Sequence, residues 1–125
     1  MAHYVPDRNH IVWLDFEPTR GREIGKYRPA LVLSGKAYNK ATGLLICCPI
    51  STSIRGAATE VAVGSLDKPS VVASNLITTL DWRQRHAKRI AEAAPGVMEA
   101  VLLRVIPLVG IDKLLLSHTR LGGQV

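Results

Sequence analysis

The chain has 125 residues, with 16 Lys and Arg against 10 Asp and Glu, and its formal net charge is +6 at pH 7. This length predicts one domain with a core of its own. The positive charge favours an anionic partner such as nucleic acid. The alternative is a protein whose surface is basic but binds no anion specifically. No stretch has the apolar length of a secretory signal or a membrane span, so we expect a cytoplasmic protein.

The only two cysteines are Cys47 and Cys48. As neighbours on a strand they would point to opposite faces, so they are not expected to form a disulfide with each other. No further Cys lies nearby and no His stands at the spacing of a metal ligand. We therefore predict reduced thiols, no structural metal and no cofactor.

The first half of the chain predicts short strands separated by turns. Strands are expected over residues 11–16 and 28–34, the second with Pro29 where it begins. Residues 39–43 are typical of a turn, and the apolar run 44–48 predicts a strand buried on both faces. Weaker strands are expected over residues 59–63, 71–73, 76–80 and, as a further candidate, 83–91.

These short strands favour a small antiparallel barrel over parallel βαβ units. From Pro95 the period changes, because apolar residues recur at helical spacing over residues 97–109. We expect one amphipathic helix that Pro107 kinks or ends near Ile106. The last stretch, residues 111–125, is expected to be a frayed tail.

The loop between the first two strands carries the strongest functional signal. Arg20, Arg22, Lys26 and Arg28 lie within a few residues of Glu23. A loop held at both ends by strands is a common place for binding and catalytic groups, and clustered cations suit phosphate. The loop therefore predicts a site for RNA or DNA.

An ordered set of residues carries a family resemblance. The set consists of residues 13–21 (WLDFEPTRG), Glu23, Gly25, 28–34 (RPALVLS), 38–39, Gly43, 49–51 (PIS), Leu80, 82–83, Arg85 and 87–89. Together they resemble the MazF/PemK family of toxin endoribonucleases over roughly residues 4–110, and a match of this length is more specific than one short motif.

The resemblance implies a fold, an activity and partners. The expected fold is mainly β with a C-terminal helix, a small SH3-like antiparallel barrel of the CcdB/MazF type, with residues 1–110 as one domain and residues 111–125 as a tail. The expected activity is metal-independent cleavage of single-stranded RNA at a short sequence motif, which leaves 2′,3′-cyclic phosphate and 5′-hydroxyl ends. The expected partners are a second copy of the chain and an acidic antitoxin.

The resemblance also assigns catalytic roles. Arg28 and Ser51 stand at the usual catalytic positions, with Thr52 adjacent, and Glu23 occupies a frequent acidic position of the loop. Chemistry supports these residue types, since a guanidinium stabilises charge on the phosphoryl oxygens and a hydroxyl donates to the same oxygens. Glu23 is the preferred base, provided that burial or the scissile phosphate makes its carboxylate more basic.

Further residues are candidates for binding the RNA. They are Thr19, Arg20, Arg22, Lys26, Tyr27, Asn75, Arg83 and Arg85. Tyr27 is the best candidate for stacking on a base, whereas Trp13 and Trp82 are expected in the core or a dimer contact. The basic run from Arg83 to Arg89 either continues the RNA path or forms a solvated face.

Two other functions and one plain structural explanation remain open. The family often has Asp-Gln where this chain has Asn75-Leu76, which admits a catalytically silent RNA-binding relative. A barrel of the related CcdB type would poison DNA gyrase without cutting RNA, but it would not need a phosphate-directed Arg28 beside a hydroxyl at Ser51. The plain alternative reads Arg28 as a strand-edge residue, Glu23 as an ion-pair partner in its loop and 51–53 as an ordinary turn.

Overall fold

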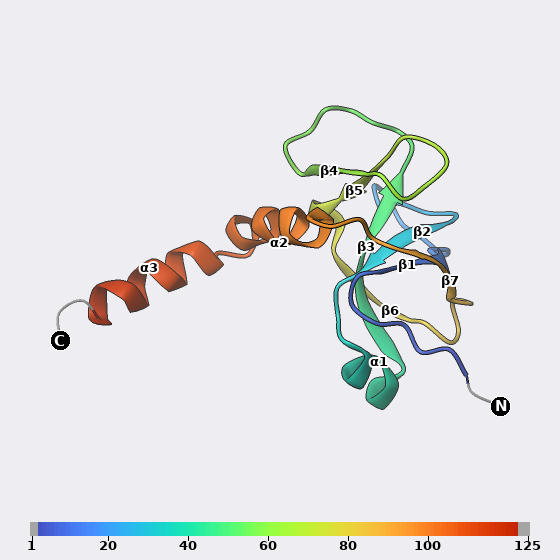
Figure 1. The fold of residues 1–125 in the computed structure, drawn as a ribbon, viewed down its shortest axis with the longest axis horizontal. Coiled ribbons are helices and arrows are strands. Elements are labelled where there is room, and N and C mark those ends of the chain that lie inside the picture. Colours follow the sequence, from blue (N-terminus) through green and yellow to red (C-terminus); the bar gives the residue numbers. More distant parts are fainter. Residues whose placement is uncertain (1–2, 123–125) are drawn as a thin grey trace.

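A curled antiparallel sheet of seven strands forms the body of the protein in the computed structural model, which describes residues 3–122 (Figure 1). In chain order the elements are β1 (His10–Asp15), β2 (Tyr27–Val32), α1 (Lys36–Thr42), β3 (Leu44–Ser51), β4 (Glu60–Val63), β5 (Ser70–Ala73), the 3₁₀ turn η1 (Ser74–Leu76), β6 (Thr78–Asp81), β7 (Lys88–Glu92), α2 (Val97–Leu108) and α3 (Ile111–Gly122). The sheet runs β4-β5-β3-β2-β1-β7, and β6 pairs with β3. The predicted mainly β antiparallel class is confirmed.

Strand β3 lies between two hydrophobic cores because its side chains alternate between the two faces of the sheet. On one face, Cys48 and Ile50 pack with Ile11 and Leu31 against α2. On the other face, Leu45 and Cys47 belong to a second core that holds Trp82. The expectation of a strand buried on both faces is confirmed.

The two cysteines are buried in different cores and both are free thiols. Burial raises the pKa of the Cys48 thiol to about 12 and shifts the pKa of Cys47 upward as well. A raised thiol pKa means little thiolate at neutral pH, so these residues act as small core side chains.

Helix α1 corrects the expectation of a turn at residues 39–43. Residues Lys36–Thr42 are helical, and Gly43 ends the helix in the left-handed conformation with φ 73°. Such a conformation favours glycine, which explains the residue at this position. The helix forms because Asn39, fully buried, hydrogen-bonds to Pro6 and Ser34, which are distant contacts that local composition does not reveal.

Three boundaries also differ from the expectation. Helix α2 continues to Leu108, so Pro107 lies inside it, and the Val109 amide still donates to the Val105 carbonyl. A proline near the last turn removes one donor while the rest of the helix stays packed through Val97, Val101 and Val105. Residues 74–76 form a 3₁₀ turn before β6, and residues 83–87 form a turn before β7.

The C-terminal stretch is helical over Ile111–Gly122, where a frayed tail was expected; residues 123–125 lie outside the described part. Helix α3 extends away from the sheet beyond α2 (Figure 1), and Leu114, Leu115 and Leu116 are exposed. Good helix formers and the adjoining α2 account for the helix, but it packs little apolar surface against the body. Within the described residues, no helix combines the length and hydropathy needed to cross a bilayer.

Deleting α3 by ending the chain after Gly110 is therefore expected to leave the fold intact. Leu114, Leu115 and Leu116 lie in solvent, so their removal forfeits little burial energy. We expect the melting temperature to change by no more than about 4 °C, the equivalent of about 1 kcal/mol for a chain of this size, as measured by thermal denaturation. A loss of cooperative unfolding would show that α3 belongs to the folding unit.

Candidate active site

The loop between β1 and β2 is held in shape by its own hydrogen bonds. The Phe16 amide donates to the Lys26 carbonyl at 2.9 Å, and the Lys26 amide donates to Glu17 Oε1 at 2.7 Å. Arg85 reaches in from the β6–β7 turn and donates to the carbonyl of Glu17 at 2.7 Å. The Glu17 carboxylate lies where a Cβ on Gly25 would stand, which explains the glycine. The loop is thus a braced platform.

Two hollows meet beneath this loop. The first, of about 300 Å³, is lined by Phe16, Pro18, Thr19, Glu23, Ile24, Asn75, Leu76, Ile77, Thr78, Leu80 and Arg85. The second, of about 340 Å³, is lined by Arg22, Glu23, Ile24, Ser51, Ser53, Arg55, Ala57, Thr59, Glu60, Val71, Ala73, Asn75 and Leu76. Because four residues line both, the hollows form one groove, which we call the cleft.

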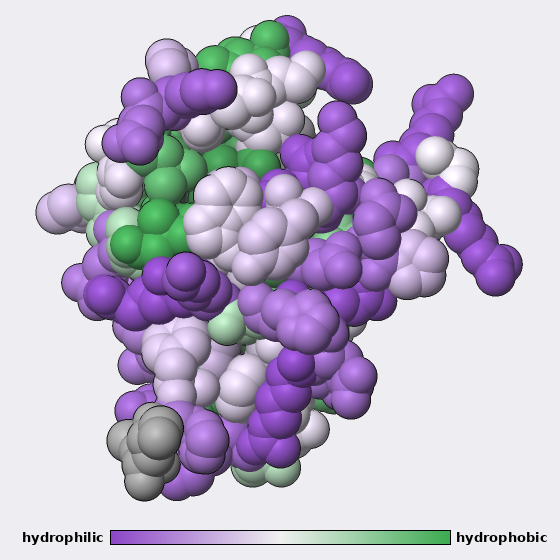
Figure 2. Space-filling view, turned by 90° about the vertical axis from the view of Figure 1, so that its right-hand side faces the viewer, coloured by the Kyte–Doolittle hydropathy of each residue, from purple (hydrophilic) through white to green (hydrophobic). Residues whose placement is uncertain are grey.

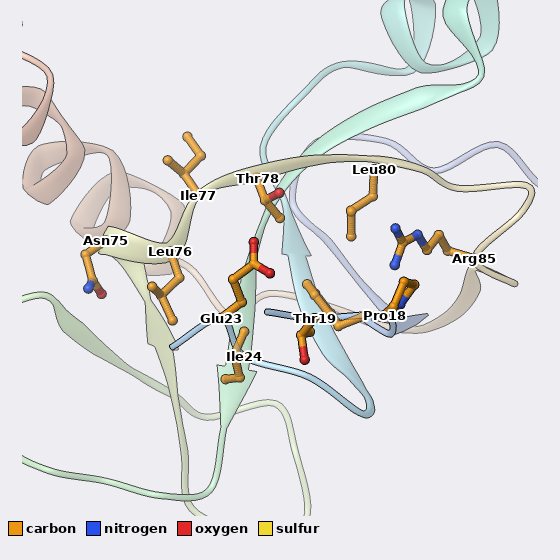
Figure 3. A pocket seen from close by; sticks show the side chains of 11 residues that line it. Pro18, Thr19, Glu23, Ile24, Asn75, Leu76, Ile77, Thr78, Leu80 and Arg85 are labelled. Atoms are coloured by element: carbon orange, nitrogen blue, oxygen red, sulfur yellow. The ribbon is translucent and has the colours of Figure 1, made fainter. Parts of the chain in front are cut away.

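Figure 3 shows how side chains enter the first hollow. Glu23 points from the loop toward the middle of the hollow, and Thr78 approaches from β6. Asn75 and Arg85 lie at its two ends, while Leu76, Ile24 and Leu80 give it apolar walls. A groove with apolar walls and a few convergent polar groups is the usual form of a binding site.

Arg28 lies at the start of β2, on the cleft side of the sheet. Its side chain is on the same face of β2 as those of Ala30 and Val32, which belong to the core that holds Trp82. Its Nε donates to the Gly25 carbonyl at 2.6 Å, which orients the guanidinium. Partial burial lowers the pKa of Arg28 from its ordinary value, while nearby Glu17 opposes that shift. An arginine starts from so high a pKa that it remains a cation.

Strand register brings Ser51 to Arg28. Strands β2 and β3 pair Val32 with Cys47 and Ala30 with Pro49. Extended by two residues, the same register sets Arg28 opposite Ser51, with both side chains on the same face. Ser51 is partly buried, lines the second hollow, and its Oγ accepts a hydrogen bond from the Ser53 amide at 3.0 Å. A cation and a hydroxyl thus lie on the same face of the sheet, with Ser51 in the lining of the cleft and Arg28 outside the lining of both hollows.

Thr52 has a different place from Ser51, although the two are neighbours. It follows the last residue of β3, its side chain is exposed, and it does not line either hollow. Thr52 lies in a bend just after the strand, so strand alternation does not place its side chain on the face that Ser51 shares with Arg28. Of the two hydroxyl candidates, Ser51 has the better position.

Glu23 lines both hollows and is exposed to solvent. Its Oε1 accepts a hydrogen bond from the Arg20 amide at 2.5 Å, and its own amide donates to the Arg20 carbonyl. The carboxylate of Glu23 is therefore not buried in the free protein. An acceptor in the middle of the cleft is nevertheless placed to meet a substrate proton.

The predicted RNA-binding residues divide into two groups. Thr19, Arg22, Asn75 and Arg85 line the cleft together with Glu23 and Ser51. Arg20 and Lys26 are exposed on the loop, outside both hollows, and Arg83 lies in the β6–β7 turn above the ring of Trp82.

Tyr27 does not face Arg28, although the two are neighbours in sequence. Its ring stacks on Trp13 with centroids 5.4 Å apart, and its hydroxyl donates to the His86 carbonyl. Because neighbours on a strand point to opposite faces, Tyr27 is held on the face away from the cleft. Trp82 is buried in the core, as expected.

Several cleft residues were missed from the sequence. Thr78 faces the first hollow because it pairs with Cys47 across β3 and β6, and Arg55 enters the second hollow from the loop after β3. Residues 76–80 were expected to form a strand, and on a strand Leu76, Thr78 and Leu80 share one face. This pattern could have identified Thr78. Arg55 sits in a polar loop with no pattern to single it out.

Comparison with known proteins identifies the family. A family model described as "PemK-like, MazF-like toxin of type II toxin-antitoxin system" matches residues 7–109, so the match ends before α3. The Escherichia coli (strain K12) protein named "Endoribonuclease toxin MazF" is 33% identical over 110 residues, which are 88% of this chain and 99% of that protein. Two structures from Deinococcus radiodurans, one of MazF and one of MazE-MazF, are each 43% identical to this chain and match 86% of it. The match spans 99% of the MazF chain, with a TM-score of 0.83, and 98% of the matched chain in MazE-MazF, with a TM-score of 0.77. The chain has the MazF fold and belongs to the family of PemK-like, MazF-like toxins of type II toxin–antitoxin systems.

Proposed function

We propose that the protein is an endoribonuclease that cuts single-stranded RNA in the cytoplasm at a short sequence motif, without a metal ion. The observation that carries the proposal is that Glu23 and Ser51 line one cleft, while Arg28 lies two residues before the paired Ala30, on the face of the sheet that Ser51 shares. These three groups match the needs of phosphodiester cleavage by the neighbouring 2′-hydroxyl. The E. coli relative's name, endoribonuclease toxin, supports the same activity.

In the proposed mechanism, Glu23 accepts the proton of the attacking 2′-hydroxyl. As the 2′-oxygen bonds to phosphorus, negative charge grows on the phosphoryl oxygens, and the Arg28 guanidinium stabilises that charge. Ser51 donates a hydrogen bond to the same oxygens and keeps the phosphate in place. The bond between phosphorus and the 5′-oxygen breaks, and the leaving 5′-oxygen takes a proton from solvent water, so the products carry a 2′,3′-cyclic phosphate and a 5′-hydroxyl.

The cleft also supports a role in reading the RNA sequence. Asn75 at one end offers an amide donor and acceptor to a base edge, and Arg22, Arg55 and Arg85 supply charge for phosphates. Leu76 contributes an apolar wall, where the family often has a glutamine. We therefore expect a motif preference that differs from that of family members with Asp-Gln at these positions.

Partners follow from the same family membership. We propose an acidic antitoxin, because the chain has a net charge of +6 and because MazE-MazF structures exist for a 43% identical relative. We also propose that the protein acts as a homodimer, which the family resemblance implies. Size-exclusion chromatography with light scattering would measure the mass of the protein in solution.

The proposed activity is tested by incubating the purified protein with a long single-stranded RNA in EDTA and mapping the cuts. We expect cuts at one short motif, with cyclic phosphate on the 3′ side of one product and a free 5′-hydroxyl on the other. RNA binding without cleavage would identify a silent relative. If the protein neither bound nor cut RNA, that result would direct attention to a protein target such as gyrase.

The two neighbouring hydroxyls are expected to differ in effect. Ser51→Ala should lower kcat by about 10²-fold, because it removes a donor to the charged phosphoryl oxygens. Thr52→Ala should change it less than about threefold, since Thr52 is exposed in the bend that follows β3 and its side chain makes no hydrogen bond within the described residues. Single-turnover cleavage of the mapped motif measures both, and Ser51→Thr tests whether a hydroxyl at this position suffices. Equal losses in the two alanine variants would contradict the assignment.

A further inference from the structure

A third hollow, which we call the α1 hollow, lies outside the cleft and has no role in the mechanism above. It has a volume of about 800 Å³ and lies between the N-terminal segment, α1 and the β6–β7 turn. It is lined by the basic side chains of Lys36, Lys40 and Arg83 and by the imidazoles of His3 and His86. Its floor is made by Tyr4, Val5, Trp82 and Ala87.

The charges of the α1 hollow have one sign. Among the described residues that line it, none is Asp or Glu, whereas Lys36, Lys40 and Arg83 are exposed cations. Two carboxylates stand close by in the chain, but both are held by backbone amides. Asp7 accepts from the amides of Arg8 and Lys36, and Asp81 accepts from the amides of Arg83 and Gln84. The lysine ammonium groups remain available to an outside anion.

The β6–β7 turn joins this hollow to the cleft. Arg83 and His86 line the α1 hollow. Arg85 lies between them in the chain, lines the cleft and braces the loop between β1 and β2. Cations of one short turn therefore line both hollows. Figure 2 shows this side of the molecule, and its lower part, toward the N-terminus, is mostly hydrophilic.

We propose that the α1 hollow binds single-stranded RNA that flanks the cleaved motif, an inference that rests on the proposed function and extends its substrate path. Lys36, Lys40 and Arg83 pair with phosphates, and the apolar floor accommodates a base or ribose without reading sequence. Single-stranded nucleic acid suits the hollow because it combines a charged backbone with apolar faces. The hollow then favours long RNA over a minimal motif.

The test compares two RNAs that share the mapped cleavage motif. One carries only two flanking nucleotides on each side, and the other carries about fifteen, enough to cross the β6–β7 turn. The variant is Lys36→Ala/Lys40→Ala, and the matched control is Lys68→Ala/Lys113→Ala, which also removes two exposed cations but lies on the β4–β5 connection and α3. Melting curves confirm that all proteins are folded.

We expect the Lys36→Ala/Lys40→Ala variant to lower kcat/KM for the long RNA by about 10-fold and to leave the short RNA unchanged. Binding of a long RNA with a 2′-deoxy nucleotide at the cut site, which lacks the attacking hydroxyl, should weaken similarly. A plot of the logarithm of the binding constant against the logarithm of the salt concentration should become less steep, by about 0.7 in slope for each lost phosphate contact. The control variant should behave like the wild type with both RNAs.

Three results would overturn the inference while the wild type still cuts RNA. They are an unchanged preference for long RNA in the variant, an equal loss with both RNAs, and an equal loss in the Lys68→Ala/Lys113→Ala control. Loss of affinity for an acidic antitoxin peptide, with RNA length preference kept, would assign the hollow to a protein partner and likewise overturn it. Failure of the wild type to cut either RNA would instead overturn the proposed function.

Discussion

Replacing Arg28 with alanine is expected to lower RNA cleavage by on the order of 10³-fold. The guanidinium lies on the face of the sheet that Ser51 shares, next to the last paired residues of β2 and β3, and the phosphoryl oxygens gain charge as the 2′-oxygen attacks. Because the effect arises in the transition state, it should appear in kcat at saturating RNA. Single-turnover cleavage of an RNA that carries the mapped motif measures it.

Stability should change much less than activity in this variant. Arg28 is partly exposed and makes one hydrogen bond, from Nε to the Gly25 carbonyl, so its loss costs about 1 kcal/mol. Lys68→Ala, which removes an exposed cation outside the cleft, is the control and should cut RNA like the wild type. Arg28→Lys keeps the charge but not the planar fork, and it should recover only part of the activity. Cleavage by Arg28→Ala at the wild-type rate would remove Arg28 from the mechanism.

The largest loss of stability is expected from Asn39→Ala. Asn39 is fully buried, and its Nδ2 donates to the carbonyls of Pro6 and Ser34 at 2.8 and 3.1 Å. Its Oδ1 accepts from Ser34 Oγ at 2.6 Å, and that hydroxyl in turn accepts from the Ile46 amide. The side chain therefore joins the N-terminal segment, the end of β2 and the start of β3.

Alanine at this position leaves buried polar groups without partners. Each such group costs about 1–3 kcal/mol, so we expect the free energy of unfolding to fall by about 3 kcal/mol. Urea denaturation measures the change, and Lys40→Ala is the control because Lys40 is exposed on the same helix. Asn39→Asp should also destabilise the protein, since it keeps the shape but replaces the donor with a buried charge. A loss below about 1 kcal/mol in Asn39→Ala would show that the network is dispensable.

Local patterns in the sequence determined the strands and the second helix. Short runs of apolar and β-branched residues predicted β1, β2 and β3, and the helical spacing of Val97, Val101 and Val105 predicted α2. The clustered cations and Glu23 marked the loop that now borders the cleft. Such signals depend on neighbours a few residues apart, so they survive without knowledge of the fold.

Contacts between distant residues were decided only by the tertiary structure. The turn-like composition around Asn39 gave no sign of α1, because that helix is held by hydrogen bonds to Pro6 and Ser34. Strand register, not sequence spacing, sets Arg28 opposite Ser51, and the same pairing turns Tyr27 to the other face.

The site itself is likewise a product of the fold. Glu23 and Asn75 share the cleft although about fifty residues separate them, and Lys36 comes to lie beside Arg83 at the α1 hollow. Strand pairing joins segments across long loops, and its register depends on the packing of both faces of the sheet at once. The residue types needed for the chemistry were therefore readable in the chain, whereas their meeting in one groove depended on how β2, β3 and β6 pair.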